Sequence, residues 1–442
     1  MMEKELQKKI NDTEEMGLPK YIKRECPINT AEMMVSSIVG ARRAGKSFRA
    51  VQAAVELTDG LPESEKRICH LDFDNPVLSG MTPSELGLIE TVFLKTRPMF
   101  GLTDRLVFIF DEIHRVPGWA DYLIALSRNP SWKVIATGSS SSIMKNDLPA
   151  ALRGKSFSTT VMPLSFREFL AFNRVETQIA STKGQAELRT LFEKFLVWGG
   201  FPAIPKLETG MKEPLLREYF DAMLLKDIIQ KNNASKPVQL TSLMYYLLSN
   251  IGRPNTISAM SNYMKQSGFK TNRDYISEYI SWAEDCWMLF SVPLFSDSQK
   301  ELEHNYKKIY CIDWALAVCN SRVWDGSYSR AFENMIYIEL LRRYRRVGYY
   351  LTKSKRQEVD FIATGVSGKP ELAVQVCLDT TFESVLKREL EPLAAASKYF
   401  GIKECLLITM DKEGTTELNG VTIRMIPAWT WMLESVGRQK SI

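Results

Sequence analysis

Apolar and polar stretches alternate over the first 160 residues of the chain. The run at 106–110 is apolar at every position, which is typical of a strand buried on both faces of a parallel sheet. Further strands are expected at 33–39, 67–73 and 132–137, and the segments between them have the lengths of helices and loops in βαβ units. The pattern predicts an α/β domain built on a parallel sheet.

The pattern becomes mostly helical after 198–202, where paired glycines and a proline end a helix and mark a domain boundary. Helices are expected near 238–250, from 256 or 258 to 267, and from Thr271, which as N-cap resembles a capping box with Asp274 three residues on. Apolar residues then repeat on one face of the third helix, at Ile276, Ile280, Ala283 and Trp287.

Three helices joined by tight turns and followed by the apolar run 290–295 predict a winged helix-turn-helix. This module can read DNA, and it is also a common protein-docking module. Basic residues near the expected recognition helix are few, namely Lys265, Lys270 and Arg273. We therefore favour a structural or protein-contact role over direct base readout for this region.

The pattern changes again from about residue 304, where helices and short strands follow in the order αβββαβ. The expected elements are a helix at 332–341, strands at 348–351, 358–363 and 372–377, a helix at 383–398 and a strand at 405–409. This order is similar to that of the PD-(D/E)xK nucleases, in which an acid on the second strand and an E-x-K on the third hold a metal and activate water. Asp360 fits the first position, but Gln375 and Cys377 replace the E-x-K residues, so we do not expect cleavage.

The strongest motif is G-x-x-x-x-G-K-S at 40–47, between a strand signal and the start of a helix. Glycines let the backbone curl so that its N–H groups converge on phosphate oxygens at a helix N-terminus. The lysine can reach the β- and γ-phosphates of ATP, and the serine hydroxyl can hold Mg²⁺. The residues expected to bind the nucleotide are Gly40, Ala41, Arg42, Arg43, Ala44, Gly45, Lys46, Ser47 and Phe48.

Acidic residues at the end of the 106–110 run supply the second half of an ATP site. We expect Asp111 to support the Mg²⁺ shell together with Ser47, and Glu112 to polarise or orient the attacking water. The strand at 132–137 ends in Gly138 and Ser139, and Ser139 is a candidate contact of the γ-phosphate or the water. A serine-rich turn without a catalytic role is the alternative for Ser139.

Composition adds limits to this interpretation. Hydrophobic residues make up 45% of the 442 residues and charged residues 25%, and the net charge of +5 does not by itself demand nucleic acid. Seven scattered cysteines and three histidines assemble no zinc-site spacing. No apolar run is long enough to cross a bilayer, and the N-terminus lacks an apolar signal region. We expect a cytoplasmic protein without a membrane partner.

Nine short segments together carry a family resemblance: GARRAGKS at 40–47, FIFDEIH at 108–114, ATGSSS at 136–141, LRG at 152–154, PLSFREFL at 163–170, WGGFP at 198–202, FEN at 332–334, EVDF at 358–361 and VQV at 374–376. The chain resembles the bacterial and archaeal AAA-type P-loop ATPases that carry a nuclease-like C-terminal domain of unknown function. The resemblance implies an AAA-type ATPase domain at 1–202, a helical or winged-helix domain at 203–303, and a restriction-endonuclease-like domain at 304–442.

One departure from this family concerns the basic residue that approaches the γ-phosphate. Members often have glycine-arginine after the leucine, whereas this chain has Arg153-Gly154-Lys155. Arg153 is therefore a candidate catalytic residue. The alternatives are Lys155 and an arginine from a neighbouring subunit, the last of which requires an oligomer.

A basic run at 342–356 lies beside the nuclease-like strands and is interleaved with tyrosines. Its cations are Arg342, Arg343, Arg345, Arg346, Lys353, Lys355 and Arg356. The run can contact the phosphate backbone of DNA, or it can be a solvated helix end whose cations interact with the helix dipole. We weigh these two interpretations equally.

Three functions follow from the sequence. The leading one is an AAA-type protein that binds ATP, hydrolyses it with Mg²⁺, and binds a protein or nucleic-acid partner through its C-terminal half. The alternative is a slow nucleotide-dependent switch or scaffold without DNA contact. A DNA-cleaving enzyme is the third, against which Gln375 and Cys377 argue.

Overall fold

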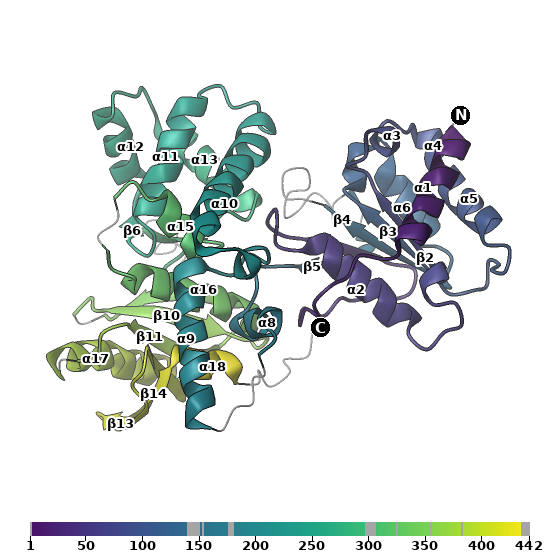
Figure 1. Cartoon of the computed structure of the whole chain (residues 1–442). Helices are drawn as coiled ribbons and strands as arrows, with labels where there is room; N and C mark the ends of the chain where they lie inside the picture. Colours follow the sequence, from purple (N-terminus) through teal and green to yellow (C-terminus); the bar gives the residue numbers. More distant parts are fainter. Residues whose placement is uncertain are drawn as a thin grey trace. The chain divides into compact units, whose positions relative to one another are not determined.

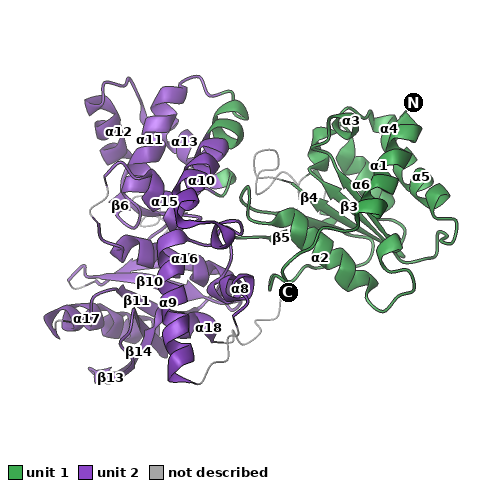
Figure 2. Cartoon of the chain, in the orientation of Figure 1, with its two compact units in different colours: residues 1–163, 225–233, 285–287 green, residues 164–224, 234–284, 288–442 purple. Residues whose placement is uncertain are grey.

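The structure, a computed structural model, describes residues 2–138, 151–152, 154–175, 181–296, 306–323, 326–353, 355–381 and 383–434. The chain divides into two compact units, which are coloured separately in Figure 2. Unit 1 comprises residues 1–163, 225–233 and 285–287, and unit 2 comprises residues 164–224, 234–284 and 288–442. The division into three domains that the sequence suggested, with boundaries at 202 and 303, stays a prediction.

The core of unit 1 is a five-stranded parallel sheet with the strand order β2-β3-β4-β1-β5 (Figure 1). The strands are β1 (Val35–Val39), β2 (Ile68–Asp72), β3 (Leu106–Asp111), β4 (Trp132–Thr137) and β5 (Ser156–Thr160). β1 and β3 are buried at every position, as expected for central strands covered on both faces. The four predicted strands are therefore confirmed, and the sheet fits the α/β fold of P-loop NTPases.

The fifth strand was not predicted. β5 has the sequence SFSTT, it is only partly buried, and it pairs with β1 along its whole length. A polar strand at the edge of a sheet has no run of large apolar residues, so the hydrophobic pattern does not detect it. Its position matters because it brings the segment after Thr160 against the loop that follows β1.

Helices surround the sheet of unit 1 (Figure 1). They are α1 (Met2–Met16), α2 (Lys46–Thr58), α3 (Pro76–Ser79), α4 (Pro83–Leu86), α5 (Leu88–Thr96) and α6 (Trp119–Leu126). α2 packs on β3 and β4, whereas α1 packs on α5 and β2. The aromatic side chains of Phe93, Phe108 and Phe110 are fully buried in this core. The Phe108 ring contacts both of the others.

The first part of unit 2 is helical and carries a small antiparallel sheet with the order β6-β8-β7. Its elements are α8 (Phe166–Phe172), α9 (Thr182–Trp198), α10 (Thr209–Ala222), α11 (Pro237–Ser249), β6 (Pro254–Asn255), α12 (Ile257–Gln266), α13 (Arg273–Asp285), β7 (Leu289–Val292), β8 (Lys307–Cys311) and α15 (Trp314–Asn320). The three helices predicted from 238 onward are confirmed as α11, α12 and α13.

Two details of the third helix differ from the prediction. Oδ1 of Asn272 accepts a hydrogen bond from the backbone N–H of Tyr275, so the cap is Asn272 and not Thr271. Trp287 does not continue the apolar face, because α13 ends at Asp285 and Trp287 has a φ of 62°. The helical repeat therefore ends before Trp287.

The second part of unit 2 is built on a six-stranded sheet with the order β13-β14-β12-β11-β10-β9. Its elements are α16 (Ser329–Arg343), β9 (Arg346–Leu351), β10 (Glu358–Thr364), β11 (Pro370–Cys377), α17 (Glu383–Phe400), β12 (Glu404–Thr409), β13 (Gly414–Leu418), β14 (Val421–Pro427) and α18 (Ala428–Leu433). The order from α16 to β12 confirms the predicted αβββαβ succession. β13, β14 and α18 follow it and were not predicted.

None of the helices within the described residues is long and apolar enough to cross a membrane.

A buried carboxylate joins two helices of unit 2. Asp313 is fully buried and accepts hydrogen bonds from the backbone N–H groups of Gly200, Ala315 and Leu316, at 2.7, 3.0 and 3.1 Å. It caps α15 and also fixes the chain just after α9. Gly199 has a φ of 75°, and a Cβ at this position would collide with the Asp313 carboxylate. The pair of glycines that ends α9 thus makes room for the cap of another helix.

Replacing Asp313 by Ala leaves three buried N–H groups without this acceptor, and we expect a loss of about 2–4 kcal/mol in the free energy of unfolding. Urea-induced unfolding followed by tryptophan fluorescence measures the effect. Asp379→Ala is the matched control, because this exposed carboxylate also accepts from a backbone N–H, that of Thr381. Equal losses in the two variants would contradict the structural role of Asp313.

Candidate functional site

The loop between β1 and α2 is curled by three residues with positive φ. Gly40, Arg43 and Gly45 have φ values of 140°, 67° and 98°. Glycine adopts this region at no steric cost, whereas Arg43 is a non-glycine residue in a left-handed conformation. Gly45 also precedes α2 without a side-chain cap. The first N–H groups of α2 therefore depend on another acceptor, which suits an anion.

Neighbouring segments hold this loop closely. A Cβ on Gly40 would collide with the carbonyl oxygen of Val161, the residue that follows β5. The buried side chain of Arg24 donates to the carbonyl oxygens of Ala44 and Met162, at 2.8 and 2.7 Å. Arg24, in the segment before β1, thus stabilises the loop through these hydrogen bonds. This role could not be predicted from the sequence, because no local pattern marks the partners of an isolated arginine.

Lys46 lies buried beneath the loop. Its Nζ donates to the carbonyl oxygens of Gly40 and Ala41, at 3.2 and 3.1 Å. Burial lowers the pKa of Lys46, and the nearby carboxylates of Glu112 and Asp111 oppose this effect. The strand and loop geometry therefore brings the predicted phosphate-binding cation close to the two predicted acids.

The other predicted residues of the loop differ in exposure. Ala41 and Ala44 are fully buried, Arg42 and Ser47 are half-buried, and Arg43 and Phe48 are exposed. The two alanines are thus enclosed by the protein, whereas Arg43 and Phe48 reach its surface.

The two acids follow directly on a buried strand. Asp111 is the last residue of β3 and is buried, and the hydroxyl of Thr137, the last residue of β4, donates to its Oδ1. The backbone N–H of Glu112 donates to the same hydroxyl oxygen at 3.4 Å. Thr137 therefore links the carboxyl ends of two neighbouring strands. This role of Thr137 was not predicted from the sequence.

Glu112 has a φ of 56°, in the left-handed region. A non-glycine residue in this conformation costs of order 1 kcal/mol or more and is concentrated at functional sites. Its Oε2 lies 3.4 Å from Nδ1 of His114, which belongs to a short helical turn at Ile113–Arg115. Burial lowers the pKa of His114 to about 4, so the imidazole is neutral at pH 7 and this contact is not an ion pair.

These residues fit a nucleotide with a divalent cation. Backbone N–H groups at the start of α2 and the Lys46 ammonium suit phosphate oxygens, and the Ser47 hydroxyl with the Asp111 carboxylate offers oxygen ligands of the kind that Mg²⁺ prefers. Two further predicted residues, Ser139 and Arg153, lie outside the described residues.

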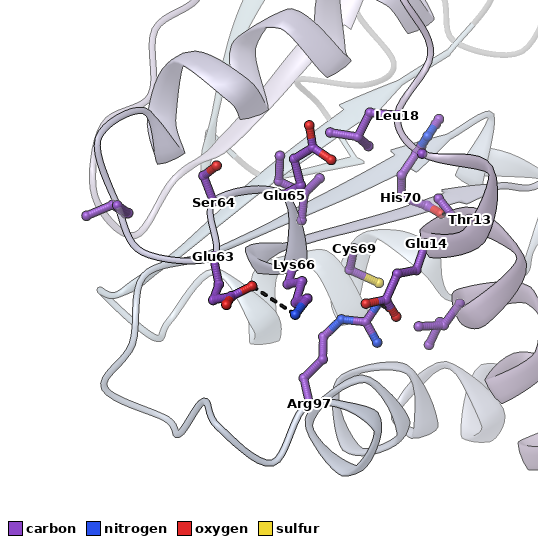
Figure 3. A pocket seen from close by; sticks show the side chains of 14 residues that line it. Thr13, Glu14, Leu18, Glu63, Ser64, Glu65, Lys66, Cys69, His70 and Arg97 are labelled. Carbon is purple, nitrogen blue, oxygen red and sulfur yellow. Dashed lines mark hydrogen bonds and ion pairs between the residues drawn. The ribbon is translucent and has the colours of Figure 1, made fainter.

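A cavity of about 580 Å³ in unit 1 has a different lining (Figure 3). It lies along α1 and the first residues of β2, and Arg97 reaches it with an Nη2 donor bonded to Glu14 at 3.0 Å. Nε of Arg97 and Nε2 of His70 are buried there without a hydrogen bond. None of the predicted nucleotide-binding residues lines this cavity, so its volume does not describe the candidate site.

Unit 2 contains a buried cation among carboxylates. The Nζ of Lys308, on β8, lies 2.8 Å from Glu333, 2.6 Å from Glu358 and 3.7 Å from Asp360. The hydroxyl of Tyr310 also donates to Glu333, at 2.5 Å. Burial lowers the pKa of Lys308, but the surrounding carboxylates raise it further, so the pKa lies well above its usual value and the ammonium stays charged.

The two residues at the predicted E-x-K positions have other partners. Oε1 of Gln375 accepts from the backbone N–H of Asp360, and its Nε2 donates to Glu389. Burial raises the pKa of the Cys377 thiol to about 11, so it is protonated at pH 7. Within the described part of the chain, no group of three or more His, Cys, Asp and Glu side chains is arranged to hold a metal ion.

The cations of the basic run at 342–356 differ in exposure and in their partners. Arg343 is nearly buried: it pairs with Glu339 at 2.8 Å, donates to the carbonyl oxygens of Trp431 and Met432, and lies over the Trp431 ring. It therefore holds α18 in place and is unsuited to a phosphate backbone. The exposed cations of the run are Arg345, Arg346, Lys353, Lys355 and Arg356.

Two parts of the chain match known family models. Residues 33–170 match a model described as AAA domain, and residues 189–324 match a domain of unknown function (DUF8612). Together with the parallel sheet and the phosphate loop, the first match identifies an AAA-type ATPase-like domain in unit 1.

The chain is similar over most of its length to two curated relatives. It is 26% identical to the uncharacterized protein MJ1544 of Methanocaldococcus jannaschii, over 94% of this chain and 91% of the relative. It is 25% identical to an uncharacterized protein of Haemophilus influenzae, over 89% of this chain and 94% of the relative.

Solved structures are more distant. The Walker-type ATPase PABY2304 of Pyrococcus abyssi has 14% sequence identity and a TM-score of 0.36, and the match covers 72% of this chain and 94% of that chain. Cdc6p from Pyrobaculum aerophilum has 9% identity and a TM-score of 0.24, with 76% and 94% covered.

Gly40→Ala tests the geometry of the loop. Because the added methyl group would collide with the Val161 carbonyl oxygen, the loop must shift, and we expect ATP affinity to fall at least tenfold. Titration of the protein with ATP and Mg²⁺ measures this. Gly87→Ala is the control, since its φ of −66° suits alanine and no atom lies within 4 Å of the added Cβ. Unchanged affinity in Gly40→Ala would argue against this loop as the nucleotide site.

Proposed function

We propose that this protein binds ATP at the loop 40–47 and hydrolyses it with Mg²⁺. The observation that supports this best is the position of Lys46, a buried ammonium between the loop carbonyls and the two acids at the end of β3. A buried cation next to the uncapped start of a helix is suited to polyanionic phosphate.

The roles of the residues follow from their places. Lys46 would neutralise phosphate charge, and Ser47 and Asp111 would hold Mg²⁺, which supplies further neutralisation of the phosphate oxygens. Glu112 would orient the attacking water and accept its proton, because its carboxylate follows directly on the Asp111 strand end. Ser139 and Arg153 remain proposed contacts of the γ-phosphate.

We also propose that the C-terminal half binds a partner and does not cut DNA. Lys308 already neutralises charge among Glu333, Glu358 and Asp360, so these carboxylates have a cation other than a metal. We propose a nuclease-like fold for the elements in the order αβββαβ. We also propose a winged-helix fold for the elements from α11 to β8. The exposed cations between 345 and 356 offer a surface for a phosphate backbone.

A slow switch without DNA contact is the alternative function. Steady-state ATP turnover, measured with and without DNA, separates the two. Turnover that DNA accelerates supports the proposal, whereas slow turnover that DNA does not change supports the switch.

Two substitutions test the hydrolytic roles. We expect Lys46→Ala to abolish detectable turnover, and Glu112→Gln to preserve ATP binding while turnover falls about a hundredfold or more, because general-base help has this magnitude. Phosphate release and equilibrium ATP binding are the measurements. Glu63→Gln, an exposed carboxylate of unit 1, is the control with normal turnover. If Glu112→Gln loses binding instead, Glu112 supports the metal or the loop, and its role as a base is wrong.

The binding surface is tested with duplex and single-stranded DNA by fluorescence anisotropy at several salt concentrations. Replacing Arg345, Arg346 and Arg356 by Ala should weaken binding and flatten the slope of log K against log salt by up to about 2.7, because each phosphate contact contributes about 0.9. The control replaces three exposed cations elsewhere in unit 2, Arg189, Arg217 and Lys403. Binding that both triple variants weaken equally would reflect net charge alone.

Cleavage is assayed in the same experiment with Mg²⁺ present. We expect intact DNA. Cleavage that disappears in Asp360→Ala would overturn the assignment of this half as a binding domain without nuclease activity.

A further inference from the structure

The side chain of Arg42 meets a carboxylate from a distant part of the chain. Its Nε donates to Oδ2 of Asp227 at 3.0 Å, and its Nη2 donates to Oδ1 at 2.6 Å. Two parallel bonds fix both the plane and the direction of the guanidinium. The Asp227 side chain is 0% exposed and that of Arg42 is 26% exposed, so the pair lies at the boundary between protein and solvent.

Asp227 belongs to a segment with an unusual place in the sequence. Residues 225–233 cluster with unit 1, although α10 and α11, which precede and follow them, belong to unit 2. This segment overlaps the helix Met223–Gln230, which has π-type hydrogen bonding. Turns of this type are rare and frequently occur at functional sites. The ion pair thus attaches this segment to the phosphate loop, which lies 185 residues earlier.

The surroundings of Arg42 connect it to the rest of the candidate site. The hydrogen bond with Asp227 raises the pKa of Arg42, and the carboxylates of Glu112 and Asp74 add to this effect. Burial is the main cause that lowers the pKa of Lys46, and the positive charge of Arg42 lowers it further. The guanidinium is therefore within electrostatic reach of both the phosphate-binding cation and the water-orienting acid.

Separation of the pair would be costly. A fully buried carboxylate that loses its ion-pair partner strongly destabilises the fold. A guanidinium can serve more than one acceptor because it has five N–H donors. Arg42 can thus stay bonded to Asp227 while it faces a second anion.

We propose that Asp227 is a positioning residue for nucleotide binding: it orients Arg42 so that the guanidinium donates to phosphate oxygens of ATP. This inference rests on the proposed function of the loop 40–47, and it assigns the segment 225–233 to the nucleotide site. It commits Asp227 to act through Arg42 and not through its own charge.

The direction in which one substitution changes the Kd for ATP separates these two modes of action. Asp227→Asn keeps the shape of the side chain and removes a negative charge. If Asp227 acted through its charge alone, ATP4− would bind more tightly to the variant, because a repulsion is lost. A positioning role predicts the opposite, a Kd for ATP that rises about tenfold, since Arg42 is no longer held in one orientation. Calorimetric titration of the full chain with ATP and Mg²⁺ measures the change.

Arg42→Lys provides a second variant that keeps the positive charge and loses the two parallel bonds. We expect it to raise the Kd about as much as Asp227→Asn does. In an Arg42→Ala background, Asp227→Asn should change the Kd less than twofold, because the group through which it acts is gone. An effect of Asp227→Asn that persists at full size in that background would indicate a merely structural role and overturn the inference.

The control is another ion pair of unit 1 with one buried partner, Arg97 and Glu14, which lines the cavity of Figure 3 and not the loop. Glu14→Gln should leave the Kd for ATP unchanged.

Failure of this inference is distinct from failure of the proposed function. If the unmodified protein does not bind ATP, the proposed function is wrong. If it binds ATP and Asp227→Asn binds equally well or more tightly, only the role of Asp227 is wrong.

Discussion

The buried charge of Lys46 is the constraint on which the candidate site depends. An ammonium removed from water is costly unless carbonyl and carboxylate groups surround it. The parallel sheet supplies both, because β1 leads into the loop whose carbonyls accept from Lys46, and β3 ends at Asp111 and Glu112. β4 lies between these two strands in the sheet, and its last residue bonds to Asp111. The strand order thus places the cation and the acids at the same edge.

Local sequence pattern predicts several parts of this candidate site. The glycine-rich loop, the buried strand before Asp111 and the helix after Lys46 all have signals within about ten residues. Arg24, Thr137 and Asp227 were missed, because their importance lies in partners from other elements. The edge strand β5 was missed for a different reason, since a polar strand paired on one side needs no apolar run.

The same limit applies in unit 2. The succession of helices and strands could be predicted, because each element there has its own period of apolar residues. Gln375 and Cys377 also indicated from the sequence that two expected nuclease groups are absent. The sequence did not indicate that Lys308, on the preceding small sheet, would enter the carboxylate cluster. Arg343 belongs to a basic run in the sequence, but its packing against α18 removes it from the proposed binding surface.

Two buried lysines, Lys308 and Lys46, have different hydrogen-bond partners. Lys308 is 2% exposed and is surrounded by carboxylates and Tyr310, so its charge is satisfied within the protein. A metal ion entering this cluster would have to displace or repel that ammonium, which disfavours a divalent cation at close range. Lys46 instead bonds to two neutral carbonyls at the start of a helix. The carboxylates of Glu112 and Asp111 lie near enough to act on this charge, but the hydrogen bonds of the ammonium go to carbonyl oxygens. This difference supports the proposal that unit 1 takes an anionic ligand.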